Sequence, residues 1–396
     1  MKSLQHLCLD SLLCSLDLRC FTARYLHELC RHLPPHICDP ILEKLHAQGL
    51  VTDGILMEFL NPSRTALSLP GATQIRNALL RQVGFHCPHL MYLDLSGCSQ
   101  VGNSVIRGIL QTCLRLTRLR LDGCHRISDA AFDMYQSPFQ ALEGCQSLEL
   151  ISLQGCNQIT GKLAEILNKN CRSLTCLNLS QCKKVQSFAV TELFYHGCMQ
   201  SLDLSFIDAV CDDAFFRIPL ASDIGADPSP LEQLSMRRAM ITDATLRRMS
   251  FFKVLKEIHL EWCAWISDDG VGEMARDCPL LHFIDLKSCP ITDLALGRIA
   301  EHCRNLRRLD ISWCQNITDS GVRRLVLGNQ VDSKVPIESC RLLERLSIIW
   351  CGKLTDSSLE YLIRLPSLCE IEAQGCRGFS ESGVATLQRK GITTYI

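Results

Sequence analysis

Cysteine, histidine and the carboxylates are the side chains that most often do chemistry, and cysteine is unusually common in this chain. The 396 residues include 25 cysteines and 12 histidines. No two cysteines have the C-x-x-C spacing of a zinc knuckle or a thioredoxin-type motif. Most of them recur in phase with leucines, which predicts reduced thiols that pack as small hydrophobic residues. We therefore expect a reducing compartment, the cytoplasm or the nucleus.

Two patterns could belong to an enzyme, and both are incomplete. The segment GCNQITGKL resembles a phosphate-binding loop, but it has five residues between its glycines and Leu163 where Ser or Thr is required. His259 lies between Glu257 and Glu261 on an expected strand. A solvated histidine that contacts a partner explains this pattern better than a general acid or base, because no nucleophile or pocket is implied. We predict no catalytic residues, no metal site and no cofactor.

The charge balance excludes two classes of ligand. Lys and Arg number 41 and Asp and Glu number 42, giving a net charge of −1. A general nucleic-acid binder would normally be basic, so we expect no nucleic acid. No uncharged apolar run reaches the roughly 18 residues of a membrane span, and His6 and Asp10 interrupt the leucine-rich start, so we expect neither membrane insertion nor secretion.

A repeat of about 24 to 37 residues organises most of the chain. Each unit reads L-x-x-L-x-L-x-x-C, then a connector, then Ile/Val/Leu-Thr/Ser-Asp, then a helical pattern, as in a leucine-rich repeat. The units that carry the cysteine end at Cys98, Cys124, Cys156, Cys182, Cys263, Cys289, Cys314, Cys351 and Cys376. Two copies without it end at Ile207 and Ala239, and an earlier copy surrounds Leu67 and Leu69. This predicts about twelve repeats, with GITTYI as a last short strand.

Each unit should contain one strand and one helix. Leu93 and Leu95 alternate with Tyr92 and Asp94, so one strand face should be buried. Six Ser/Thr-Asp pairs have the form of helix N-caps, at Ser128-Asp129, Thr242-Asp243, Ser267-Asp268, Thr292-Asp293, Thr318-Asp319 and Thr355-Asp356. Three longer units have insertions around 134–147, 218–231 and 326–339, which we expect to be protruding loops.

The units ISWCQNITDSGVRRL and EWCAWISDDGVGEMARDCPLL resemble the cysteine-containing class of leucine-rich repeats. That class occurs in F-box/leucine-rich-repeat proteins and in the antagonist-of-mitotic-exit-network family. The resemblance implies an α/β solenoid (a horseshoe) with short parallel strands inside and helices outside, offering an extended concave binding surface. We divide the chain into a helical N-terminal segment, 1–50, and a solenoid of about twelve repeats, 51–396.

The N-terminal segment resembles a docking element for a ubiquitin ligase. Ser3-Leu4-x-x-x-Cys8-x-x-x-Leu12 is similar to an elongin-C-binding box, and Leu33-Pro34-x-x-Ile37-x-x-x-Ile41 is similar to the cullin box that follows it. The whole stretch is also similar to the openings of Zyg-type receptors. The resemblance implies that elongins B and C bind through Leu4, Cys8 and Leu12, and that a cullin binds through Pro34, Ile37 and Ile41.

Other interpretations of this segment remain open. Its helices could simply cap the first repeat, since solenoid ends need shielding. LPPHICDPILEKL also resembles the start of an F-box, which would bind a Skp-type adaptor, although no Trp occurs before position 262. Finally, Asp39-Pro40 has the form of an N-cap followed by a first helical residue, which predicts that a helix starts after Ile37.

The concave face should be polar and mixed in sign, which suits a protein target. Trp262, Trp313 and Trp350 occupy one repeat position, directly before the cysteine, and Trp265 lies nearby. Exposed Trp beside Arg is typical of binding hot spots, although these tryptophans could instead cover the turns. The predicted target-binding residues are Trp262, Trp313, Trp350, His259, Arg308 and Arg345. We predict a non-catalytic substrate-recognition subunit of an elongin–cullin ubiquitin ligase; the alternative is a repeat scaffold without a ligase role.

Overall fold

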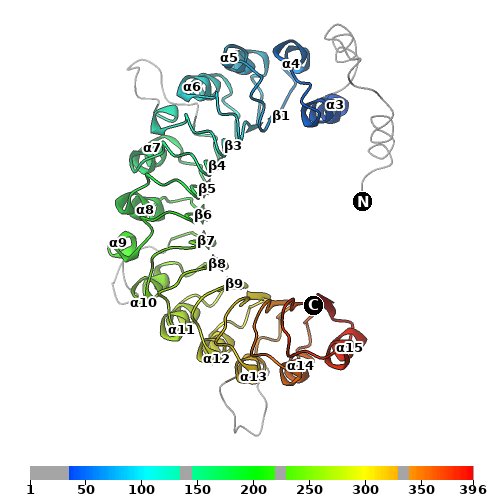
Figure 1. The fold of residues 1–396 in the computed structure, drawn as a ribbon. Coiled ribbons are helices and arrows are strands. Elements are labelled where there is room, and N and C mark those ends of the chain that lie inside the picture. Colours follow the sequence, from blue (N-terminus) through cyan, green and yellow to red (C-terminus); the bar gives the residue numbers. More distant parts are fainter. Residues whose placement is uncertain (1–34, 134–144, 219–228, 329–338, 396) are drawn as a thin grey trace. The chain divides into compact units, whose positions relative to one another are not determined.

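The computed structural model describes residues 35–133, 145–218, 229–328 and 339–395. The chain divides into two compact units, residues 1–184 and 185–396. In each unit short parallel strands form a sheet, and the helices lie on one side of it (Figure 1). This is a leucine-rich-repeat α/β fold, as the sequence predicted.

The strands are each three residues long and pair in parallel with their neighbours in sequence order. Equivalent repeat positions lie opposite one another, such as Leu309 and Leu346. In unit 1 the strands are β1 (Ala66–Ser68), β2 (Tyr92–Asp94), β3 (Arg118–Arg120), β4 (Leu150–Ser152) and β5 (Cys176–Asn178). In unit 2 they are β6 (Ser201–Asp203), β7 (Gln233–Ser235), β8 (Glu257–His259), β9 (Phe283–Asp285), β10 (Arg308–Asp310), β11 (Arg345–Ser347), β12 (Glu370–Glu372) and β13 (Thr393–Tyr395). The middle residue of β1 to β12 is buried, which confirms the predicted alternation, and β13 is the short strand expected in GITTYI.

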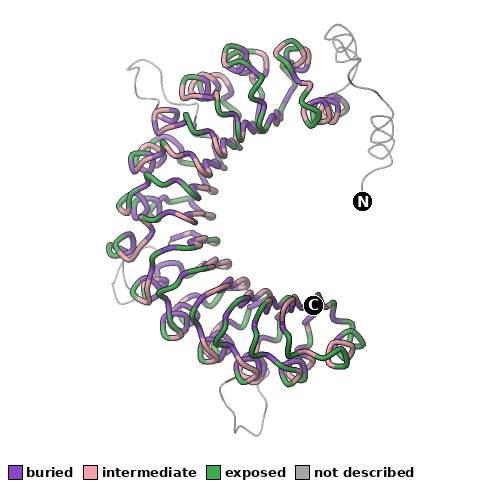
Figure 2. Tube along the Cα trace, in the orientation of Figure 1, coloured by how far each residue is buried: buried purple, intermediate pink, exposed green. Residues whose placement is uncertain are grey.

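The repeat cysteines are part of the core, where buried positions recur from one repeat to the next (Figure 2). The Sγ of Cys314 donates to the carbonyl oxygen of Leu286 in the preceding repeat at 3.2 Å, and that of Cys263 donates to Met236 at 3.3 Å. Burial raises the pKa of both thiols to about 12. They therefore stay protonated at neutral pH and act as small buried donors between repeats. Every cysteine in the described ranges is a free thiol.

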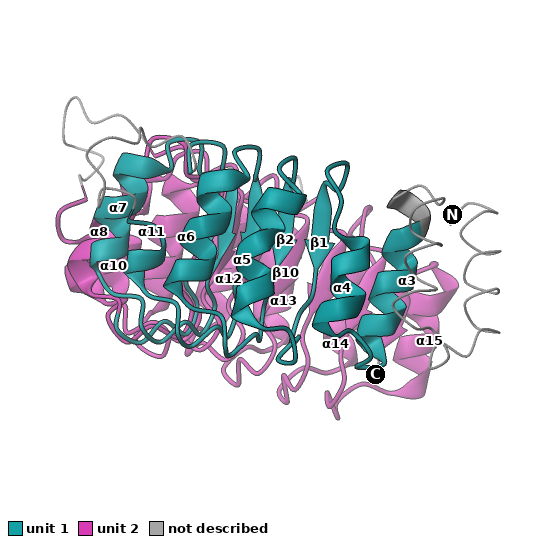
Figure 3. Cartoon of the chain, turned by 90° about the horizontal axis from the view of Figure 1, so that it is seen from above, with its two compact units in different colours: residues 1–184 teal, residues 185–396 magenta. Residues whose placement is uncertain are grey.

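The helices follow the strands and are coloured by unit in Figure 3. In unit 1 they are α3 (Pro35–Ala47), α4 (Asp53–Phe59), α5 (Asn77–His86), α6 (Asn103–Thr112), the 3-10 turn η2 (Asp129–Ala131) and α7 (Lys162–Asn170). In unit 2 they are α8 (Ser187–Phe194), α9 (Asp212–Phe215), α10 (Asp243–Leu246), the 3-10 turn η3 (Met249–Phe251), α11 (Asp268–Asp277), α12 (Asp293–His302), α13 (Asp319–Leu327), α14 (Asp356–Leu362) and α15 (Glu381–Arg389). Five of the six predicted caps accept a backbone N–H through their side chains, and Ser128 does not.

The aspartate after each cap makes a contact that the sequence analysis did not predict. Its carboxylate accepts both the backbone N–H and the hydroxyl of the cap residue in the next repeat. We call this set the aspartate ladder. Its pairs are Asp129–Thr160, Asp212–Thr242, Asp243–Ser267, Asp268–Thr292, Asp293–Thr318, Asp319–Thr355 and Asp356–Ser380. Each helix start is thereby tied to the helix start before it by two charge-assisted hydrogen bonds.

The expectation that a helix begins after Ile37 was wrong. Helix α3 spans Pro35–Ala47 and contains both Ile37 and Pro40. Pro40 has no N–H, so it removes one backbone hydrogen bond from the first turns of the helix. The burial of Ile41 and Leu45 offsets that cost. Ile41 exposes only 7% of its surface.

The predicted insertions at 134–147, 218–231 and 326–339 lie mostly outside the described residues. Within the described ranges, no helix combines the length and hydropathy needed to cross a bilayer. The same ranges contain no group of three or more His, Cys, Asp or Glu side chains arranged to hold a metal ion.

Candidate protein-binding surface

The candidate surface lies on β8 to β12 of unit 2. We call it the strand face, and it consists of the first and third residues of each of these strands. Those residues are Glu257, His259, Phe283, Asp285, Arg308, Asp310, Arg345, Ser347, Glu370 and Glu372. Because the middle residues point into the core, the flanking side chains point the opposite way. Asp285 and Ser347 are buried among their neighbours, and the other eight side chains are partly or fully exposed.

Arg308 is held in place by residues from two other strands. Its Nη2 lies 2.8 Å from Oε1 of Glu257 on β8. To reach that carboxylate its guanidinium passes over the ring of Phe283 on β9, at 4.5 Å from the ring centroid. A cation over an aromatic face is favourable and the ion pair fixes its direction. Arg308 is thus a pre-positioned side chain that remains 41% exposed.

His259 is a structural neighbour of the same group. Its ring meets Phe283 edge-on, with centroids 4.9 Å apart and an interplanar angle of 86°. Its Nδ1 lies 3.1 Å from Nη2 of Arg237 and 3.6 Å from Oδ2 of Asp285. With this nitrogen shared between two charged neighbours, the ring serves to hold the arrangement together. The His259 side chain is 18% exposed and supports its neighbours, and its contact with a target remains a prediction.

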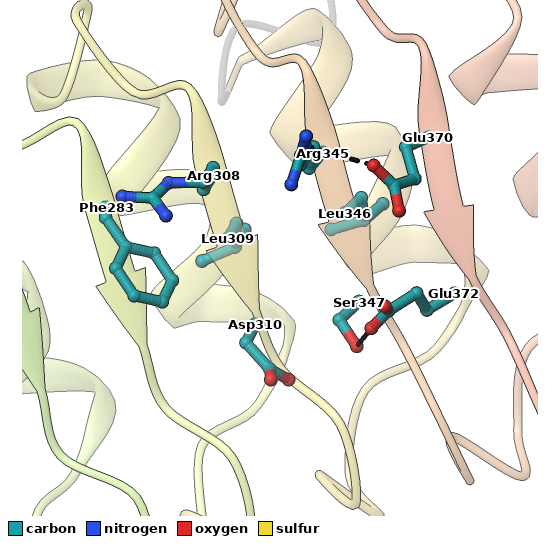
Figure 4. A pocket seen from close by; sticks show the side chains of 9 residues that line it. All are labelled: Phe283, Arg308, Leu309, Asp310, Arg345, Leu346, Ser347, Glu370 and Glu372. Atoms are coloured by element: carbon teal, nitrogen blue, oxygen red, sulfur yellow. Dashed lines mark hydrogen bonds and ion pairs between the residues drawn. The ribbon is translucent and has the colours of Figure 1, made fainter. Parts of the chain in front are cut away.

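A shallow cleft of about 160 Å³ opens between β9 and β12, as Figure 4 shows. It brings together the two predicted residues Arg308 and Arg345, whose strands are neighbours. Arg345 Nε lies 3.0 Å from Oε2 of Glu370, and the hydroxyl of Ser347 donates to Oε2 of Glu372 at 2.9 Å. The cleft is therefore lined by side chains that are already engaged with one another.

Asp310 lies in the same cleft without a comparable partner. Its Oδ1 accepts the backbone N–H of Ser312 at 2.8 Å. Burial raises the pKa of this carboxyl above its ordinary value, the Ser312 hydrogen bonds oppose that rise, and the nearby charge of Asp285 adds to it. Asp310 and Glu372 are not among the predicted target-binding residues, because the absence of an ion pair at these carboxylates depends on where the arginines point.

The tryptophans occupy the turns that follow the strands, in a conformation that favours glycine. Trp262, Trp313 and Trp350 have φ of 62°, 64° and 57°. The same position in other repeats also has positive φ, both where it is glycine (Gly97, Gly123, Gly155 and Gly375) and where it is another residue (Gln181, Phe206, Arg238 and Ser288). A bulky residue in this region costs about 1 kcal/mol or more, and such cost is often retained at binding sites.

Both interpretations of the tryptophans find support. Trp262, Trp313 and Trp350 are 50%, 45% and 42% exposed, and Trp265 is 69% exposed. Trp313 and Trp350 stack, with centroids 5.2 Å apart and planes 26° from parallel. A Cβ added to Gly375 would come within 2.6 Å of the Trp350 ring, so this ring also covers the next turn. The two rings cover the turns and still leave nearly half of their surface open to a partner.

The N-terminal predictions can be followed only in part. Leu4, Cys8, Leu12 and Pro34 lie outside the described residues, so their predicted contacts remain predictions. Ile41 is only 7% exposed, the side chain of Ile37 is not described, and the cullin contact of Pro34, Ile37 and Ile41 remains a prediction.

Comparisons with known proteins agree with the repeat architecture. A family model described as leucine-rich repeat matches residues 86–104 and 302–326. Bovine F-box/LRR-repeat protein 4 is 26% identical over 199 residues, which is 46% of this chain and 30% of that protein. Arabidopsis thaliana GRR1-like protein 1 is 31% identical over 113 residues, which is 27% of this chain and 19% of that protein. The chain therefore spans a third or less of the length of these relatives.

A solved structure is similar along almost the whole chain. The crystal structure of the yeast Rad7 and Elc1 complex contains a chain that matches with a TM-score of 0.63 at 18% identity. The match covers 100% of this chain and 98% of that chain. At this identity the likeness shows a shared leucine-rich-repeat fold.

Proposed function

We propose that this leucine-rich-repeat protein is a non-catalytic substrate-recognition subunit of a ubiquitin ligase. In this proposal the strand face of unit 2 binds the protein target. The N-terminal segment binds the ligase through elongins B and C and a cullin. The free thiols of the repeats support a reducing location in the cytoplasm or the nucleus.

The observation that carries the target-binding role is the strand face itself. Arg308 and Arg345 are fixed by ion pairs and yet 41% and 62% exposed. Side chains that are ordered before binding lose less conformational entropy when a partner arrives. Beside them, Trp313 and Trp350 offer exposed aromatic surface at a position where glycine would cost less. Arg and Trp are the residue types most enriched in binding hot spots.

The ligase role draws its support from the similar proteins. The bovine relative is named as an F-box protein, and the Rad7 chain was solved with Elc1. The likeness to Rad7 favours an elongin-like partner for this chain, in line with the Leu4, Cys8 and Leu12 pattern. The similarity to F-box proteins supports the alternative that the chain binds a Skp-type adaptor.

Capture of adaptors by the full chain tests the proposal. Wild type and the double variant Leu4→Arg plus Cys8→Arg would each be incubated with purified elongin B/C and, separately, with a Skp1-type adaptor. We expect wild type to retain elongin B/C and the variant to lose it, because two arginines cannot enter an apolar pocket without large desolvation cost. Equal elongin recovery by both proteins would contradict the docking role of these residues.

The matched control places the same two charges elsewhere. Phe85 and Phe188 are 74% and 55% exposed, so Phe85→Arg plus Phe188→Arg adds two arginines without burying them. This control should capture elongin B/C as well as wild type does. Retention of the Skp1-type adaptor instead of elongin B/C would overturn the elongin assignment and leave the receptor role standing.

A further inference from the structure

The cleft on the strand face has an unequal charge balance. Arg308 is neutralised by Glu257, and Arg345 is neutralised by Glu370. Asp310 and Glu372 also line the cleft, and neither forms an ion pair within the described part of the chain. Two negative charges are therefore left without a counter-ion in a hollow of about 160 Å³.

The strand register brings these two carboxylates to either side of one residue. Asp310 on β10 lies opposite Ser347 on β11, and Ser347 lies opposite Glu372 on β12. Ser347 already donates to Glu372, and Asp310 accepts hydrogen bonds from Ser312 on its own turn. Figure 4 shows the carboxylates of Asp310 and Glu372 on the same side of the cleft, away from the guanidinium of Arg345.

The burial of Asp310 also favours a cationic ligand. Its pKa is raised, chiefly because burial disfavours the charged form, and the neighbouring Asp285 adds repulsion. The charge of Lys287 opposes this rise, but its Nζ lies 3.3 Å from Glu261, to which it is paired. A cation entering the cleft would relieve the unfavourable environment of Asp310.

We propose that this cleft binds a lysine or arginine side chain of the target protein, with Asp310 and Glu372 as its counter-ions. This inference rests on the proposed function, because it names the chemistry of the target that the strand face recognises. The charged end of the side chain lies between the two carboxylates, where a guanidinium or ammonium can donate to both. Trp313 and Trp350 follow Asp310 and Ser347 by three residues each, so the flanking residues of the target meet the tryptophan stack.

An anionic ligand fits the cleft less well. A phosphate or carboxylate approaching Arg308 or Arg345 would have to displace Glu257 or Glu370. It would also bring further negative charge beside Asp310 and Glu372. A cation meets neither obstacle, so the described contacts favour the cationic side chain.

Selection of peptides on the full chain tests the inference without knowledge of the natural target. A random peptide library displayed on phage would be selected on wild type and on Asp310→Asn plus Glu372→Gln. The selected peptides would then be measured by fluorescence polarisation. We expect one position to be enriched in Lys or Arg on wild type, and the double variant to bind those peptides about tenfold to hundredfold more weakly. Replacing that residue by norleucine or citrulline should weaken binding to wild type and have little effect on the variant.

A matched control removes the same charge from a helix. Asp277→Asn plus Glu273→Gln on α11 changes the net charge equally, and both carboxylates belong to ion pairs away from the strand face. This control should bind the peptides as wild type does. If it weakens binding as much as the cleft variant, the effect comes from long-range charge and the inference is overturned.

The remaining outcomes separate this inference from the proposed function. A selection without a Lys or Arg preference, or one that yields no binder, overturns the cleft assignment. If such peptides still lose affinity on Trp313→Ala, the strand face remains the binding surface and only the cationic specificity fails. Peptides that are insensitive to Trp313→Ala and to the cleft variant would contradict both.

Discussion

The aspartate ladder gives the sharpest test of how the repeats are joined. Asp293, the first residue of α12, accepts the N–H of Thr318 through Oδ1 at 2.8 Å and its hydroxyl through Oδ2 at 2.6 Å. Thr318 in turn accepts the N–H of Ser320 at 3.2 Å, as the cap of α13. Removing the carboxylate should therefore loosen the start of α13 as well as the contact between the two repeats.

The expected size of the effect follows from the bonds that are lost. Hydrogen bonds to a charged group contribute about 1.5–3 kcal/mol each, and water can replace part of that at this half-exposed site. Asp293→Ala should therefore cost about 2–4 kcal/mol. Asp293→Asn should cost about 1 kcal/mol, since the amide can make both bonds and only the charge is lost.

The chain contains its own precedent for the Asn variant. Asn103 occupies the ladder position one helix earlier than Asp129, with Oδ1 accepting the N–H of Ser128 at 2.9 Å and Nδ2 donating to its hydroxyl at 2.8 Å. Urea unfolding followed by circular dichroism would give the overall cost. Hydrogen exchange of the amides in α13 (Asp319–Leu327) would show whether the loss is local.

Two results would refute this reasoning. An Asp293→Ala protein within 0.5 kcal/mol of wild type would show that the ladder adds little, a difference of about twofold in the folding equilibrium. An Asn variant as unstable as the Ala variant would show that an amide cannot replace the carboxylate in these two hydrogen bonds. Exchange that increases equally throughout the described residues, with no preference for α13, would argue against a local tie.

Two further predictions concern the tryptophan turns and the acid response. Because Trp313 has φ of 64°, Trp313→Gly should be about 1 kcal/mol more stable than Trp313→Ala by urea unfolding, the reverse of the usual order, and a more stable Ala variant would contradict the backbone argument. Both variants should lose the stack with Trp350, worth about 0.5–1.5 kcal/mol, and should weaken target binding. Although burial raises the pKa of Asp212, hydrogen bonds from Thr242 and Thr245 lower it below its ordinary 3.8 overall. Its contribution is therefore fully present above pH 3.8 and lost as the pH falls through the lower folded-state value, so Asp212→Asn should flatten the loss of stability in acid titrations, and an unchanged slope would oppose this.

The sequence alone determined the repeat fold. The spacing of leucine and cysteine identifies the strand and the helix of each unit, because residues that must be buried recur with the period of the structure. The cap residues were equally predictable, since a hydroxyl that accepts a nearby N–H is a local interaction. GITTYI was predicted as a last short strand, although its middle residue is Thr394 where the preceding unit has Ile371.

Tertiary structure decided everything that depends on neighbouring repeats. Asp293 reads as a favourable first-turn residue in its own helix, and only the stacking of repeats shows that it binds Thr318. Arg308 skips one strand to reach Glu257, fifty-one residues away, and so leaves Asp310 without a counter-ion. Helix α3 continues through Pro40 because burial of apolar side chains outweighs the local preference of Asp39-Pro40 for a helix start. Local periodicity fixes which face a residue takes, whereas the pairing of charges across strands depends on distances that exist only after the repeats have stacked.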